Sequence, residues 1–148
     1  MIIGVPKEIK KDEFRVGITP SGVLEYTKAG HSVLIEQGAG LGSGFDDTAY
    51  RDAGAIILEN ADEVYAGAEM ILKVKEPIEA EYNRLKENQI LFTYLHLAAD
   101  KKLTEILCAK KIIAFAYETL RIGRRLPLLE PMSEIAGRMA TLFGAVHL

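Results

Sequence analysis

Three residues that can bind an anion or exchange a proton lie where an α/β sheet would present them. Lys75 and His96 each follow a short apolar run, at residues 70–74 and 90–95, and Arg15 lies in the segment after the first such run. In an open parallel sheet, ligands bind just outside the carboxyl ends of the strands. Two cations and one imidazole at that edge predict a site for a small anionic substrate that exchanges a proton.

Short apolar runs alternate with helical patterns along most of the chain. Strands are expected at residues 2–5, 33–35, 55–58, 70–74, 90–95 and 112–116. Near-continuous apolar strands are typical of parallel sheets that are covered on both faces. The sequence therefore predicts an α/β fold, namely a Rossmann-like, doubly wound and mostly parallel sheet with helices on both faces.

Cap residues divide these strands from the helices between them. Because their side-chain oxygens can accept a backbone N–H of the first helical turn, helix starts are expected at Thr19, at Asp46 or Asp47, at Asn60 and at Asp100. Helix ends are expected at Gly30 and Gly54. After a long connection at residues 117–131, a last helix is expected from an N-cap at Ser133 to Leu148, and the chain stops within this pattern.

The composition narrows the class of protein. The 148 residues carry a formal net charge of −3, which argues against a nucleic-acid binder. No apolar run approaches the roughly 18 residues that span a bilayer, so no membrane partner is expected. The single cysteine, Cys108, excludes an intrachain disulfide and has no metal-ligand spacing around it. A cytoplasmic protein without a metal site is the expectation, with Cys108 buried or half-buried in a helix.

The glycine-rich segment at residues 38–44 invites comparison with a dinucleotide-binding loop. The pattern G-x-G-x-x-G fails, because Ser43 or Phe45 stands where the third glycine is required. The carboxylates of Asp46 and Asp47 follow directly and would repel a phosphate. A structural turn, in which glycine supplies positive φ angles, is the expectation for this segment.

Seven short blocks occur in order along the chain. They are Gly4-Val5-Pro6-Lys7-Glu8, Glu13-Phe14-Arg15-Val16 with Thr19-Pro20, Gly38-Ala39-Gly40, Leu72-Lys73-Val74-Lys75-Glu76-Pro77, Leu95-His96-Leu97-Ala98, Ala116-Tyr117-Glu118-Thr119 and Pro131-Met132-Ser133-Glu134. With these blocks the chain resembles the N-terminal part of the alanine dehydrogenase family, across essentially its whole length. The first blocks are also similar to the proton-translocating transhydrogenase subunit, but the presence of both Lys75 and His96 favours the alanine dehydrogenase branch.

The resemblance implies the reversible oxidative deamination of L-alanine to pyruvate and ammonia with NAD. Hydride would leave Cα for nicotinamide, and the imidazole would help water attack the resulting imine. The implied roles are substrate binding for Arg15, Lys75, Tyr94, Glu118 and Met132, acid/base catalysis for His96, and cofactor binding for Ser133. A guanidinium suits a carboxylate because its rigid fork pairs both oxygens, and an imidazole titrates near pH 6.5.

The resemblance also implies a division of the chain. Residues 1–128 correspond to the N-terminal part of the substrate, or catalytic, domain, and residues 129–148 to the start of an interdomain linker helix. The NAD-binding domain of the family is absent from this sequence. We therefore expect a homo-oligomer that binds L-alanine or pyruvate, holds no NAD tightly and is inactive alone.

Two other hypotheses remain open at this point. The chain could be a non-catalytic, truncated or split module that self-associates through its last helix, or a fragment of a transhydrogenase alpha subunit.

Three of the residues named above also have structural interpretations. Lys73 is assigned a structural or salt-bridge role, Glu118 orients a basic group or caps backbone, and Met132 packs in the core or contacts the substrate.

Overall fold

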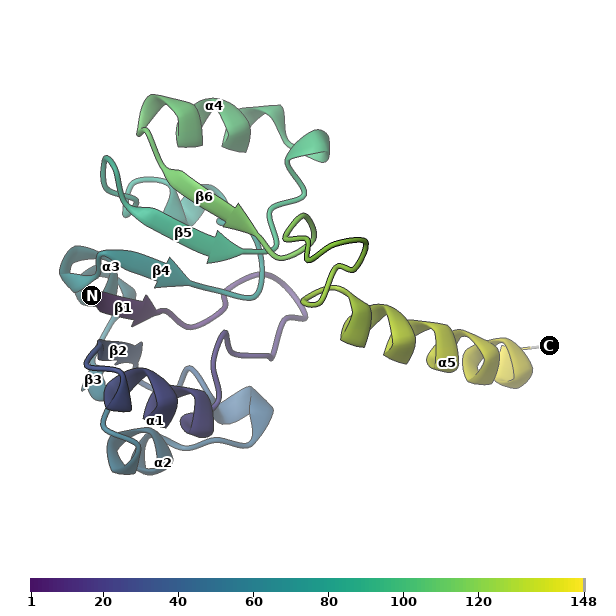
Figure 1. The fold of residues 1–148 in the computed structure, drawn as a ribbon, viewed down its shortest axis with the longest axis horizontal. Coiled ribbons are helices and arrows are strands. Elements are labelled where there is room, and N and C mark those ends of the chain that lie inside the picture. Colours follow the sequence, from purple (N-terminus) through teal and green to yellow (C-terminus); the bar gives the residue numbers. More distant parts are fainter. Residues whose placement is uncertain (148) are drawn as a thin grey trace.

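A computed structural model describes residues 1–147 and shows six strands in one sheet (Figure 1). The strands are β1 (Ile2–Val5), β2 (Ser32–Glu36), β3 (Ile56–Leu58), β4 (Met70–Leu72), β5 (Ile90–Thr93) and β6 (Ile113–Ala116). Their order is β3-β2-β1-β4-β5-β6, and every neighbouring pair is parallel. The winding direction changes between β1 and β4, which is where open sheets of this kind bind ligands. The predicted α/β fold is confirmed.

Helices cover both faces of this sheet. They are α1 (Pro20–Lys28), α2 (Asp47–Asp52), α3 (Ala61–Gly67) and α4 (Lys101–Ala109). A further helix, α5 (Glu130–His147), lies outside these layers, and 3₁₀ turns occur at η1 (Leu41–Ser43), η2 (Glu79–Glu81) and η3 (Leu97–Ala99). On one face, Val23 of α1 and Tyr50 of α2 pack against β1 and β2. On the other, Tyr65 of α3 and Leu103 of α4 pack against β4 and β5. The sheet therefore separates two apolar cores.

The predicted helix caps are confirmed. The Oγ1 atom of Thr19 accepts the backbone N–H of Gly22 at 3.2 Å. Side chains of Asp46, Asn60 and Asp100 cap α2, α3 and α4 in the same way. The helix-ending glycines adopt positive φ angles, +82° at Gly30 and +95° at Gly54. These features depend on neighbours in the sequence, so the local pattern suffices to predict them.

Two strands end two residues earlier than predicted. β4 ends at Leu72 and not at residue 74, and β5 ends at Thr93 and not at residue 95. At the end of β5, the backbone N–H groups of Leu95 and His96 donate to the Glu118 carboxylate and not to a neighbouring strand. The chain leaves the sheet here, and this exit carries His96 to the rim.

The predicted N-cap at Ser133 is wrong. Helix α5 begins three residues earlier, at Glu130, and Pro131 lies in its first turn. Proline is tolerated there because its missing N–H would have no partner within the helix. Ser133 is instead an exposed residue of the helix, and its N–H donates to the carbonyl of Leu129 at 3.1 Å. The predicted helix end at Leu148 lies outside the described residues.

The prediction for the cysteine is also wrong. Cys108 is exposed, because α4 buries Leu103 and Leu107 and the thiol lies off that face. Helical periodicity alone places residue 108 next to the buried stripe and not within it.

Helix α5 extends away from the sheet (Figure 1). None of its residues is buried. Its exposed apolar side chains are those of Ile135, Met139, Leu142, Phe143 and Val146. Within residues 1–147, no helix is both long and apolar enough to cross a membrane.

Candidate functional site

The predicted site residues follow three neighbouring strands. Arg15 lies in the loop after β1, Lys75 follows β4 by three residues, and His96 follows β5 by three. Because β1, β4 and β5 are adjacent and parallel, these segments leave the same edge of the sheet. The predicted edge is therefore confirmed as the place where these segments gather.

Arg15 is held by a carboxylate two residues away. Its Nη2 and Nε atoms donate to the two carboxylate oxygens of Glu13, at 2.6 and 2.8 Å. The backbone N–H of Arg15 donates to the same carboxylate at 2.9 Å. The remaining terminal nitrogen, Nη1, lies 3.5 Å from Sδ of Met132 in α5. Two segments far apart in the sequence thus fix this guanidinium.

Arg15, Tyr94 and Met132 line one pocket of about 400 Å³. The hydroxyl of Tyr94 donates to the carbonyl of Leu128 at 2.8 Å. Burial raises the pKa of Tyr94, partly opposed by the nearby charge of Arg15, so its phenol is neutral. Three of the predicted substrate-binding residues therefore share a pocket that offers one cation, one hydroxyl and a thioether.

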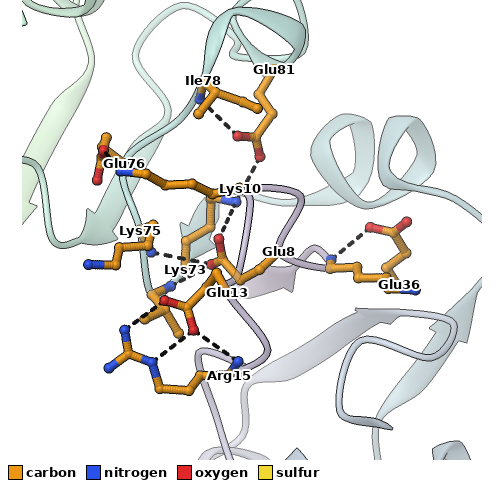
Figure 2. Close-up of polar contacts among 12 residues, drawn as sticks. Glu8, Lys10, Glu13, Arg15, Glu36, Lys73, Lys75, Glu76, Ile78 and Glu81 are labelled. Carbon is orange, nitrogen blue, oxygen red and sulfur yellow. Dashed lines mark hydrogen bonds and ion pairs between the residues drawn. The ribbon is translucent and has the colours of Figure 1, made fainter. Parts of the chain in front are cut away.

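Lys75 stands near this pocket with its ammonium unpaired. Its backbone N–H donates to Glu8 at 3.4 Å, while none of the ion pairs within residues 1–147 includes its side chain. Figure 2 shows the Lys75 side chain extending away from the other residues drawn, with no contact at its ammonium nitrogen. Its positive charge is one of the causes that lower the pKa of Glu13. Lys75 is thus a half-buried cation available to an anion.

A buried ion-pair network lies next to Lys75 and is centred on Lys73. The Nζ of Lys73 lies 3.2 Å from Glu8 and 2.7 Å from Glu81, and at most 3% of any of these side chains is exposed. The hydroxyl of Tyr65 donates to Glu81 at 3.0 Å. Glu8 also accepts the backbone N–H of Val74 at 2.7 Å. The predicted salt-bridge role of Lys73 is confirmed, whereas Glu8 and Glu81 were not predicted.

His96 has an unusual backbone conformation. Its φ angle is +49°, in the left-handed region that few residues other than glycine adopt. The imidazole is exposed and stacks on the ring of Tyr94, with centroids 6.1 Å apart and planes at 11°. It lines a separate hollow of about 550 Å³ together with Glu118. The structure thus places His96 beside the Arg15 pocket, joined to it through Tyr94.

Glu118 holds this conformation. Its carboxylate accepts the backbone N–H groups of Leu95, at 3.0 Å, and of His96, at 2.8 Å. Burial opposes ionisation of Glu118, but these and other backbone donors outweigh it and lower its pKa. Of the two roles considered for Glu118, the structure favours capping of backbone.

Replacement of Glu118 by alanine is expected to destabilise the protein by about 1.5–3 kcal/mol, the contribution of hydrogen bonds to a charged group. The loss should appear in urea unfolding and in broadened amide signals at Leu95 and His96. Glu105→Ala is the control, because Glu105 makes only an exposed pair with Lys101. Equal unfolding midpoints for the two variants would contradict this role of Glu118.

The glycine-rich turn does not fit a dinucleotide. Gly38 and Gly44 adopt positive φ angles, as expected for a structural turn. The backbone N–H of Gly38 donates to the carboxylate of Asp47 at 2.9 Å, so this N–H already has an anionic acceptor within the chain. Helix α2 follows with Asp46 as its cap and has only six residues. Among residues 1–147, there is also no cluster of three or more side chains suited to a metal ion.

Comparisons with known proteins agree on one family. The sequence model described as "Alanine dehydrogenase/PNT, N-terminal domain" matches residues 4–136. Alanine dehydrogenases from Methanococcus maripaludis and Bacillus subtilis are 59% and 55% identical over the whole chain, which spans 40% and 39% of their lengths.

Solved structures give the same result. A structure of L-alanine dehydrogenase superposes with a TM-score of 0.94 and 53% identity, over 98% of this chain and 40% of that one. A transhydrogenase from Sinorhizobium meliloti gives 0.77 and 28%, over 84% of this chain and 37% of that one. The chain thus spans about two fifths of the relatives that it matches.

Proposed function

This chain belongs to the alanine dehydrogenase/PNT family, whose N-terminal domain it contains, and we propose that it is the substrate-binding portion of an NAD-dependent L-alanine dehydrogenase. The proposed overall reaction converts L-alanine, NAD⁺ and water into pyruvate, ammonium, NADH and a proton. Identity above 50% over the whole chain favours this activity over that of a transhydrogenase, for which the identity is 28%.

The observation that carries the proposal is the fixed guanidinium of Arg15 in a pocket, with the unpaired ammonium of Lys75 nearby. L-Alanine and pyruvate share a carboxylate and differ at Cα, so a carboxylate site serves both directions of the reaction. Arg15 would pair the carboxylate oxygens, and Lys75 would bind one oxygen and the adjacent carbonyl. Tyr94 and Met132 would enclose the methyl group.

His96 would act as the acid/base group. Its exposed imidazole has no hydrogen-bond partner within residues 1–147, and it lies beside the pocket on the ring of Tyr94. In this role it would take a proton from the water that attacks the imine carbon and return one to the departing ammonia. An imidazole suits both transfers because it is protonated and deprotonated near neutral pH.

NAD would accept the hydride in the proposed reaction, but the described residues do not offer it a site. In the glycine-rich turn, the N–H of Gly38 already donates to the carboxylate of Asp47, whose charge would repel a pyrophosphate. Ser133, assigned to the cofactor by resemblance, is exposed on α5 and contributes a single hydroxyl. We therefore assign to this chain the binding of substrate and the transfer of protons, without tight binding of NAD and without turnover alone.

We also propose that the chain self-associates in the cytoplasm. The apolar side chains of α5 support association, because they are exposed along the helix and none of its described residues is buried. The single free thiol is consistent with a reducing compartment.

The proposal predicts that the chain binds pyruvate through its carboxylate. Saturation-transfer NMR should detect pyruvate and should not detect methyl pyruvate, which has the same carbonyl but no charge. Arg15→Lys keeps the positive charge and loses the fork, so it should weaken pyruvate binding about tenfold, in line with the loss of a bond between charged groups. Equal binding of the ester and the anion, or no binding of either, would contradict the proposed function.

A further inference from the structure

The contact between Glu13 and Arg15 uses one particular edge of the guanidinium. A guanidinium has five N–H bonds and can pair a carboxylate either through Nε and Nη2 or through its two terminal nitrogens. Glu13 takes the edge formed by Nε and Nη2, at 2.8 and 2.6 Å. The edge formed by the two terminal nitrogens is the one that a second carboxylate could use.

The one other side-chain contact of Arg15 within residues 1–147 uses a single N–H bond of its terminal nitrogens. Nη1 donates to Sδ of Met132 at 3.5 Å, and this sulfur, at the pocket, is a weak acceptor. Within residues 1–147, two N–H bonds of the terminal nitrogens have no acceptor. Figure 2 shows the carboxylate of Glu13 on one side of the guanidinium, where Nε and one terminal nitrogen contact it, while the other terminal nitrogen has no contact with Glu13.

Glu13 is itself held as an anion in this place. Its side chain is only 7% exposed, whereas that of Arg15 is 45% exposed. Hydrogen bonds from Arg15 outweigh the effect of burial and lower the pKa of Glu13 to about 2, with Lys75 contributing. The carboxylate is therefore ionised throughout the neutral range, and it faces both cations of the site without filling the pocket.

We propose that Glu13 is a positioning residue, which fixes the plane of the Arg15 guanidinium so that its terminal edge meets the carboxylate of the substrate. This role rests on the proposed function, because it assumes that Arg15 binds such a carboxylate. A free arginine side chain would lose rotamer entropy on binding, and the prior contact with Glu13 removes part of that cost. Glu13 acts through Arg15 and does not touch the substrate.

The test compares Glu13→Gln with Asp62→Asn. Asp62 pairs with Nε of Arg84 at 2.6 Å, far from the site in the sequence, so it controls for the loss of any carboxylate–arginine pair. With ¹⁵N-labelled arginine, exchange of the Arg15 Nε–H with water should become about tenfold faster in Glu13→Gln and stay unchanged in Asp62→Asn. The Arg84 signal should show the opposite pattern, which also confirms that both variants are folded.

Pyruvate titration of the same samples completes the test. Glu13→Gln should bind pyruvate about tenfold more weakly than the wild type, and Asp62→Asn should bind it equally well. Unchanged binding by Glu13→Gln would overturn the role of Glu13 and leave the proposed function intact. Tighter binding would overturn it as well, because Glu13 would then compete with the substrate for Arg15. A wild-type chain that binds no pyruvate would reject the proposed function together with this role.

Discussion

Replacement of Lys75 by alanine is expected to weaken pyruvate binding by at least about tenfold, because a hydrogen bond between charged groups contributes about 1.5–3 kcal/mol. Lys75 is half-buried and its ammonium makes no ion pair within residues 1–147, so its removal breaks none. Its backbone is held by Glu8, which keeps the loop in place in the variant. Isothermal titration with pyruvate measures the loss.

Lys7→Ala provides the matched control for this experiment. Lys7 is exposed and follows β1 at the same edge of the sheet, so both variants remove one positive charge from that edge. Pyruvate affinity should change little in Lys7→Ala. A similar loss in both variants would show that net charge attracts the anion without a specific contact, and unaltered affinity in Lys75→Ala would remove Lys75 from the site.

Lys73→Met is expected to destabilise the protein by about 3–5 kcal/mol, although Lys73 and Lys75 are only two residues apart. The side chain of Lys73 is 0% exposed and is the shared cation of Glu8 and Glu81. Without it, two buried carboxylates face each other with only backbone donors and the hydroxyl of Tyr65 to stabilise them. Urea unfolding monitored by circular dichroism measures the effect.

Two further variants test why Lys73→Met destabilises the protein. Lys101→Met removes a lysine whose pair with Glu105 is fully exposed, so it should change stability by less than about 0.5 kcal/mol. The triple variant Lys73→Met, Glu8→Gln and Glu81→Gln removes the charges together and should recover a large part of the loss. If the triple variant is no more stable than Lys73→Met, packing and not uncompensated charge explains the destabilisation.

The fold could be predicted from the sequence because its signals are local. Thr19, Asn60 and Asp100 cap helices through donors three residues away, and the apolar runs mark the strands wherever both faces are covered. The start of α5 was missed because Pro131 was interpreted as a residue before the helix, whereas the first turn accommodates it.

The sequence predicts the residues of the candidate site but not the residues that hold them in place. Glu8 reaches Lys73 across 65 residues, and Glu118 reaches His96 across 22. No periodicity encodes such contacts, since they depend on which strand ends the topology brings together. The pair of Glu13 and Arg15 is different, because its two residues are close in the sequence and opposite in charge. That pair could have been predicted from the loop alone.

The base of α5 has a mechanical consequence for the pocket. With 18 residues, the helix is about 27 Å long, and Met132 lies only about 3 Å along its axis from Glu130. If the helix swings by about 10° around its first residue, its far end travels about 5 Å and Met132 moves by about half an ångström. Rotation of α5 about its first residue therefore moves its C-terminal end much farther than Met132. A large displacement of that end would leave the contact between Met132 and Arg15 nearly unchanged.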